Sequence, residues 1–557
     1  MKKLLLYTAF LWTALSACNA QSGGSSDGGD DSGPGTEATE KKISSRDRSI
    51  TRANAYSDLF LDSTALIDFI RTRKVPDSTA RRMVSFYNAR NYQYAWFTSN
   101  GLTEQARGFW NLHDYHTAYQ HDTIFHDKTL ARRMDDWTTQ ENRRFAAGDK
   151  NVLQTEFTLT EHFIQYIRRN YPDGQVKRKE MERFVPLKKR DPMELADSLL
   201  TKKHKDNKYF EDANASYGAL KKELKRYYDI VKAGGWQPVT GSLNGLKPGA
   251  SAPIVAQLKR RLTITGDMPA GDTSAVFNDT LLTGIRNFQQ RMGYTPSDKL
   301  TDQQLKDLNV PARARLEQVL INLERMRWLP QSPEGRIILV NIPEFVLHVY
   351  ENKQKAFDMN IVVGKEGHTT TAFNGDLNQV VFSPYWNVPP SIVKNEILPK
   401  LASNPGYLDA QNMEQVGTEG GLPRIRQRPG PDNSLGRVKF LFPNSLNIYF
   451  HDTNAKSLFS KDKRAFSHGC IRLSEPEKLA NYLLQDMPEW DAARIEEAMS
   501  AGTEKYVRLK KPVPVVITYY TAWVDDAGRL NFRDDIYAHD RDLAQKMFSG
   551  MQQTAKR

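Results

Sequence analysis

The chain has 557 residues, more than one hydrophobic core usually supports, so two to four domains are expected. A hydrophobic fraction of 39% and a mean hydropathy of -0.62 argue against a polytopic membrane protein, because no internal stretch approaches the ~20 apolar residues of a spanning helix. The net charge of +12 suits an anionic partner or a solvated surface. No nucleic-acid-binding motif accompanies the charge, so nucleic acid is not expected as a partner.

The N-terminus has the pattern of an export signal. A basic start and an apolar run over residues 4–15 precede Leu15-Ser16-Ala17-Cys18. This ending resembles the bacterial lipobox, whose Cys is lipidated and becomes the mature N-terminus; an ordinary signal peptide with a chance Cys is the alternative. We predict a lipoprotein signal over 1–18, a membrane anchor on Cys18 and a flexible Gly, Ser and Asp rich linker over 19–44.

The next region, residues 45–235, has helical periodicity. Leu220, Leu224 and Tyr228 recur at spacings of four residues, as on one face of a helix. We find no catalytic cluster in this region, so it is predicted to be a helical scaffold domain.

Residues 236–310 have the pattern of short helices separated by turns that contain glycine. Val255, Leu258 and Leu262 mark a first helix, and Phe288-Gln289 precedes Gly293. This pattern resembles the three-helix peptidoglycan-binding domain. Residues 311–335 return to a helical pattern and end in a linker, so the three-helix unit is expected to be inserted in the scaffold.

From residue 336 the pattern changes to strands, and 336–525 is predicted to be a mostly β domain. Runs such as Arg336-Ile337-Ile338-Leu339-Val340 and Val513-Pro514-Val515-Val516-Ile517 are rich in β-branched residues. The stretch 400–436 is instead rich in Pro, Gly and Asn, and a loop of that length is usually functional, so it is predicted to be a lid. Residues 526–557 are predicted to be a C-terminal tail. The fold class is therefore multidomain α+β.

The chemistry is concentrated around Cys470. If Cys18 carries lipid, Cys470 is the only remaining thiol, because the sequence contains two cysteines. A lone Cys in an exported protein is a candidate nucleophile, although free Cys is most often a buried small hydrophobe. A Cys nucleophile needs a base, and His451 or His468 could serve by spacing alone. Glycine at 469 lets backbone amides approach a developing oxyanion, and Arg472 could bind a substrate carboxylate.

Two other classes of site share these residue types. His451, His468 and Cys470 could be zinc ligands, but no established zinc motif accompanies them, and we predict no metal. A papain-like or NlpC/P60-like hydrolase would also pair Cys with His. In those families the Cys precedes its His, whereas here His539 alone follows Cys470.

Residues 337–524 resemble the L,D-transpeptidase (YkuD-type) catalytic domain. The family hallmark is a His, then some 14–17 residues, then Ser/Thr-His-Gly-Cys, and this chain has His451 and Ser467-His468-Gly469-Cys470. Trp386-Asn387-Val388-Pro389 and Tyr449-Phe450-His451-Asp452-Thr453 resemble the long YcbB-like subgroup, which carries a peptidoglycan-binding domain. Many members of the family have Asn two residues after the Cys, where this chain has Arg472.

The resemblance implies a role for each residue of the site. Cys470 would be the nucleophile and His451 its general acid/base, paired as thiolate and imidazolium. The backbone carbonyl of Asp452 would orient His451. Backbone amides of His468, Gly469 and Cys470 would form the oxyanion hole. Four residues are expected to bind substrate: Arg472, Tyr449, Trp386 and Ser467.

The resemblance also implies the reaction. The enzyme would form 3→3 cross-links between peptidoglycan tetrapeptide stems through a Cys470 thioester, with loss of the terminal D-Ala and no cofactor. Water as acceptor would make an L,D-carboxypeptidase, and a protein Lys would make a wall-attachment enzyme. A non-catalytic wall-binding protein is a further alternative. Carbapenems are expected as covalent inhibitors. The expected location is the periplasm, anchored to the outer membrane because Asn19 rather than Asp follows Cys18.

Overall fold

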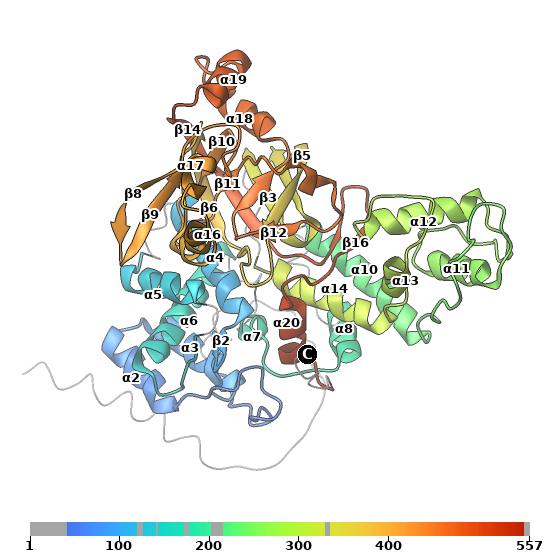
Figure 1. Cartoon of the computed structure of the whole chain (residues 1–557). Coiled ribbons are helices and arrows are strands. Elements are labelled where there is room, and N and C mark those ends of the chain that lie inside the picture. Colours follow the sequence, from blue (N-terminus) through green and yellow to red (C-terminus); the bar gives the residue numbers. More distant parts are fainter. Residues whose placement is uncertain are drawn as a thin grey trace, which may run out of the picture. The chain divides into compact units, whose positions relative to one another are not determined.

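The computed structural model describes residues 42–119, 126–140, 143–171, 176, 178–201, 215–328 and 335–550 (Figure 1). The predicted signal segment with Cys18, and the linker up to residue 41, lie outside this range. Within the described range, no helix has the length and apolar character needed to cross a membrane.

The first region is helical, as the sequence predicts. Its helices are α2 (Ser63–Arg73), α3 (Asp77–Ala89), α4 (Glu104–Tyr119), α5 (Lys128–Thr139), α6 (Lys150–Asn170), α7 (Arg178–Arg183), α8 (Pro192–Leu200) and α10 (Ala215–Lys232), with a short hairpin of β1 (Phe97–Thr98) and β2 (Gly101–Leu102). The buried Glu156 carboxylate joins α6 to this hairpin region, because it accepts hydrogen bonds from the amides of Ala95 (2.7 Å) and Trp96 (3.0 Å). Burial raises the pKa of Glu156 to about 7. The Glu156 carboxylate therefore has hydrogen-bond donors although it lies within an aromatic core.

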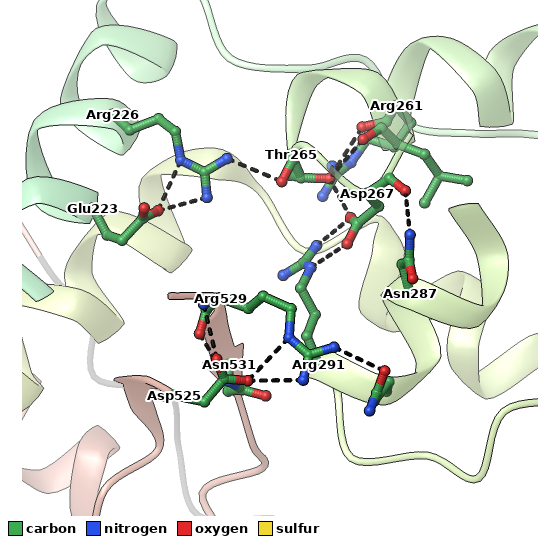
Figure 2. Close-up of polar contacts among 12 residues, drawn as sticks. Glu223, Arg226, Arg261, Thr265, Asp267, Asn287, Arg291, Asp525, Arg529 and Asn531 are labelled. Atoms are coloured by element: carbon green, nitrogen blue, oxygen red, sulfur yellow. Dashed lines mark hydrogen bonds and ion pairs between the residues drawn. The ribbon is translucent and has the colours of Figure 1, made fainter. Parts of the chain in front are cut away.

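The predicted three-helix unit consists of α11 (Pro253–Ile264), α12 (Asp279–Arg291) and α13 (Asp302–Leu308). Figure 2 shows the polar contacts that fix it internally and to its neighbours. Arg291 donates to both oxygens of the Asp267 carboxylate at 2.5 and 2.7 Å. Arg226 of α10 donates to the Thr265 carbonyl at 2.9 Å, and Arg529 donates to the Gln290 side chain at 2.9 Å.

Helix α14 (Ala312–Met326) packs against α10, so the helices on either side of the three-helix unit are neighbours, as expected for an insertion. The C-terminal residues pack on the same helix. They form β15 (Ala522–Val524), β16 (Leu530–Phe532) and α20 (His539–Met547). The buried Asn322 side chain bonds to Thr521 in both directions, at 2.8 and 3.0 Å, and Arg325 pairs with Asp540 at 2.5 Å. The prediction of a tail is therefore wrong for residues 526–550.

Among the described residues, nine strands form the main sheet, in the order β12-β5-β13-β11-β10-β6-β14-β3-β4. Strand β5 pairs with β4 as well as with β13, which closes the sheet into a barrel. The strands are β3 (Arg336–Asn341), β4 (Val346–Glu351), β5 (Gln354–Gly364), β6 (Asn374–Phe382), β10 (Val438–Leu441), β11 (Phe450–His451), β12 (Ala465–Ser467), β13 (Ile471–Leu473) and β14 (Lys505–Thr518). The short helices η4 (Ile342–Glu344) and η6 (Lys456–Ser460) lie in its loops. Helices α18 (Pro476–Leu484) and α19 (Ala492–Ser500) pack on its core.

The predicted lid is an ordered subdomain and begins earlier than expected. It spans residues 386–427 and contains β7 (Trp386–Asn387), α15 (Pro390–Ile392), η5 (Val393–Ile397), α16 (Leu398–Ser403), α17 (Tyr407–Ala410), β8 (Met413–Glu419) and β9 (Leu422–Gln427). Strands β7, β9 and β8 form a small sheet, and the segment has its own hydrophobic cluster of Val388, Ile392, Val393, Ile397, Met413 and Ile425. The name "lid" is used below for residues 386–427.

Candidate active site

Two neighbouring parallel strands bring the histidine and the cysteine to one face of the sheet. In β11 and β13, Phe450 lies opposite Ile471, and both side chains are fully buried in the barrel core. Since successive side chains in a strand point to opposite faces, the residues on either side of this pair face away from the core. The other face therefore carries Tyr449 and His451 from one strand and Cys470 and Arg472 from the other.

The strand register also sets the separation of His451 and Cys470. His451 lies opposite Arg472, so Cys470 is two residues away along the neighbouring strand. A strand spacing of about 4.8 Å and a rise of about 3.3 Å per residue give roughly 8 Å between their Cα atoms, within reach of an imidazole and a thiol. The distant histidine of the motif, and not only its immediate neighbour His468, is thereby placed on the same sheet face as the cysteine, one strand away.

His451 is held by the backbone of the next residue. Its Nδ1 lies 2.5 Å from the carbonyl oxygen of Asp452, and the residue is 4% exposed. A carbonyl can only accept a hydrogen bond, so Nδ1 carries the proton and Nε2 is left as the basic nitrogen. The Asp452 carboxylate points elsewhere, accepting from the amides of Arg437 (2.8 Å) and Thr453 (2.7 Å).

Three groups surround the Cys470 thiol. The thiol donates to the backbone carbonyl of Asn447, with Sγ and O 3.7 Å apart. The hydroxyl and the amide of Tyr449 donate toward the sulfur. Asn447, which lies shortly before β11, has a φ of +54°, and this left-handed conformation directs its carbonyl to the thiol.

Burial controls the protonation of this pair. It raises the pKa of the Cys470 thiol, outweighing the lowering by the Tyr449 donors and by the charge of Arg472. It also lowers the pKa of His451 to about 3, helped by the charge of Arg472. Both shifts favour an uncharged thiol beside an uncharged imidazole at neutral pH. This differs from the thiolate–imidazolium pair that the family resemblance implies, because desolvation disfavours the charged form of each group, although Cys470 itself is only partly buried.

The turn from Ser467 to Cys470 is braced from both sides. The Ser467 hydroxyl donates to the Cys470 carbonyl at 2.6 Å and accepts from the Gly469 amide at 3.2 Å. The Thr370 hydroxyl donates to the Gly469 carbonyl at 2.7 Å. Ser467 is 2% exposed, so its hydroxyl holds the turn and is not presented to a substrate. With the Gly469 amide engaged, the amides of His468 and Cys470, which bond to no described residue, are the available oxyanion donors.

Replacing Gly469 with alanine should strain the backbone of this turn, but the added Cβ should not collide with a neighbouring atom. Gly469 has a φ of +113°, and the nearest atom to an added Cβ would be the Thr369 carbonyl oxygen at 3.8 Å. A backbone conformation of this kind costs about 1–3 kcal/mol for other residues, and displaced oxyanion donors should lower the acylation rate of Cys470 by about 10²-fold. Intact-mass kinetics with a carbapenem measure this rate. Gly528→Ala, at a φ of +75° in the β15–β16 turn, is the matched control and should acylate normally. Normal acylation of Gly469→Ala would contradict the assignment.

The other residues that the sequence predicts for the site have different surroundings. Arg472 lies beside His451, and its Nε bonds to no described residue, so the guanidinium retains donors for a carboxylate. Trp386 pairs with Gln427 in the lid sheet and packs on the lid cluster. The ring of His468 turns from Cys470 toward the lid, with Nε2 2.9 Å from the Glu396 carboxylate.

Two residues of the site carry no motif in the sequence. Thr370, which braces Gly469, stands in a run of three threonines. Lys439 lies opposite His451 on β10, is 9% exposed, and its ammonium makes only long contacts of 3.4 Å with Tyr385 and Glu504. In the sequence, Lys439 stands between the apolar residues Val438 and Phe440. This alternation predicts that Lys439 lies on the face away from the core, which is the face that carries His451.

The two histidines of the motif have different partners. His451 is bound to the Asp452 carbonyl, and His468 is directed to Glu396. Over the described part of the chain, no group of three His, Cys, Asp or Glu side chains is arranged to hold a metal ion. The zinc interpretation therefore has no donor set here.

Comparison with protein families identifies the domain that contains this site. The model of the L,D-transpeptidase catalytic domain (YkuD) matches residues 335–517, which contain both strands of the site. Residues 335–517 are an L,D-transpeptidase catalytic domain. A second model, described as a scaffold domain, matches residues 81–224, within the helical region.

One curated relative is similar to part of this chain. A Haemophilus influenzae protein named "Putative L,D-transpeptidase" is 29% identical over 243 residues, which are 41% of this chain and 49% of that protein. The chain thus matches about half the length of that relative.

Solved L,D-transpeptidases from Xylanimonas cellulosilytica and Stackebrandtia nassauensis are 14% and 13% identical. The first covers 51% of this chain and 100% of its own, with a TM-score of 0.17; the second covers 50% and 97%, with a TM-score of 0.21.

Proposed function

We propose that the chain is an exported L,D-transpeptidase that forms 3→3 cross-links in peptidoglycan through a thioester on Cys470. The observation that carries this proposal is the pairing of β11 with β13, which puts His451 and Cys470 on neighbouring strands at one face of the sheet, with Nε2 of His451 left as the basic nitrogen. The match of residues 335–517 to the L,D-transpeptidase catalytic domain supports the same reaction class.

In the first half-reaction, His451 Nε2 takes the thiol proton as the sulfur attacks the carbonyl carbon of the third residue of a tetrapeptide stem. The amides of His468 and Cys470 stabilise the negative oxygen of the tetrahedral intermediate. The intermediate collapses, the bond to the terminal D-Ala breaks, and the departing amine takes the proton from His451. A thioester remains on Cys470.

In the second half-reaction, the side-chain amine of a neighbouring stem attacks the thioester and gives its proton to His451. The new amide is the cross-link, and the proton returns to the sulfur. The charge of Arg472 beside His451, with an unpaired Nε, suits a carboxylate of the donor stem.

The proposal includes export and a lipid anchor on Cys18. The support is the sequence of residues 1–18, with Asn19 favouring the outer membrane of a periplasmic protein. In expressing cells supplied with labelled palmitate, the original chain should take up the label and a Cys18→Ser chain should not. Equal labelling of the two chains, or no labelling of the original, would show that the anchor is wrong.

The reaction is tested by incubating the purified chain with a tetrapeptide donor and analysing the products by mass spectrometry. Cross-linked dimers with one D-Ala released for each are expected, and a carbapenem should form a covalent adduct. Tripeptide alone would instead identify a carboxypeptidase, and transfer to a protein Lys would identify an attachment enzyme. No product and no adduct would indicate a non-catalytic wall-binding protein.

A further inference from the structure

The lid helix contains a single π turn. Its segments α15, η5 and α16 run without interruption from Pro390 to Ser403, and η5 (Val393–Ile397) is π-helical, with the Leu398 amide donating to the Val393 carbonyl. Pro399 stands inside this helix and cannot donate to the carbonyl four residues earlier, and the wider turn accommodates it. Turns of this kind are frequent at functional sites.

Glu396, in that π turn, connects the lid to the catalytic turn. Its Oε1 lies 2.9 Å from Nε2 of His468, with 45% of the Glu396 side chain and 31% of the His468 side chain exposed. The opposite side of the Glu396 helix is fixed, because Ile392, Val393 and Ile397 are buried in the lid cluster. The carboxylate therefore comes from a rigid part of the lid.

The side chain of His468 is held by residues outside the catalytic turn. Ser467 and Thr370 fix the carbonyls of Cys470 and Gly469. The imidazole of His468 lies against His368, with ring centroids 4.9 Å apart, and toward Glu396. The His468 amide is one of the two available oxyanion donors, so a movement of the lid helix would act on the position of that donor through the imidazole.

We propose that Glu396 is a positioning residue that couples closure of the lid to the geometry of the oxyanion-binding turn. The inference rests on the proposed function and deepens it. With the Glu396–His468 contact made, the lid covers the acyl-enzyme while the amine acceptor reacts. Without the contact, the lid and the turn move independently, and water reaches the thioester more often.

The test compares Glu396→Ala and Glu396→Gln with the original chain. With tetrapeptide donor and acceptor, Glu396→Ala should raise the ratio of hydrolysed to cross-linked product by about 5- to 10-fold, the effect of losing one partly exposed charge-assisted hydrogen bond. Glu396→Gln keeps an oxygen acceptor and should restore at least half of the change. Glu419→Ala removes an exposed carboxylate from the same lid, 81% exposed in its side chain, and should leave the ratio unchanged.

Carbapenem adduct formation, followed by intact mass on the same samples, separates the possible failures. If the original chain forms no adduct and no product, the proposed function is overturned together with this inference. If the original chain cross-links and is acylated, but Glu396→Ala gives the same product ratio, the coupling role of Glu396 alone is overturned.

Discussion

Replacing Cys470 with alanine should abolish the acyl-enzyme and lower acyl transfer by at least about 10⁴-fold, because removal of a nucleophile eliminates the covalent route. The fold should survive, since the Sγ contacts are confined to Tyr449 and the Asn447 carbonyl. Intact mass after incubation with a carbapenem, and product analysis with tetrapeptide, measure the loss. A Cys470→Ala chain that still forms the adduct would remove Cys470 from the mechanism.

Cys470→Ser is the matched control for this experiment. The hydroxyl retains a donor for the Asn447 carbonyl and an acceptor for Tyr449, so the packing of the site is nearly kept. A hydroxyl is a much weaker nucleophile than a thiol, so Cys470→Ser should also fail to cross-link. Activity close to the original in Cys470→Ser would mean that the thiol is not the reacting group.

Replacing His451 with glutamine should lower the acylation rate by about 10²- to 10⁴-fold, the range for loss of a general base. Glutamine can still donate to the Asp452 carbonyl, but it cannot take the thiol proton. His468→Gln keeps its backbone amide and should lose much less. An equal loss in both variants would contradict the assignment of the base to His451.

The same pKa shifts predict the pH dependence of acylation. The pKa of His451 lies at about 3, below its ordinary value, so the imidazole remains a free base as the pH falls from 8 to 5. The rate of carbapenem acylation should therefore show no inflection near pH 6.5, where an ordinary imidazole would become protonated. The thiol, whose pKa is raised, should also react slowly with small alkylating reagents at neutral pH. Rapid alkylation at pH 6 would instead identify a thiolate–imidazolium pair.

The catalytic strands could be predicted because their information is local. The alternation in Phe450-His451 and Ile471-Arg472 separates core-facing from site-facing residues. The β-rich runs of β3 and β14 are likewise confirmed as strands. The helical region and the three-helix unit follow from apolar spacing within single helices.

The features that the sequence did not predict depend on contacts between distant residues. The lid extends back to Trp386 because Ile392 and Val393 are buried with Ile425, some thirty positions later. The C-terminal segment is folded because Asp540 pairs with Arg325. The Ser467 hydroxyl, expected to contact substrate, instead serves a turn whose shape appears only in three dimensions.

The contacts of α14 with the end of the chain have a consequence for the order of folding. Asn322 and Arg325 are buried polar groups of the helical region, and their partners Thr521 and Asp540 lie about 200 positions later. Until those late residues arrive, the two side chains lack these bonds, and a buried polar group without a partner is costly. The helical region therefore completes its core only after nearly all of the polypeptide has been made. A fragment ending at residue 525 would keep Thr521 but lack the C-terminal helix, and with it the Asp540 partner of Arg325.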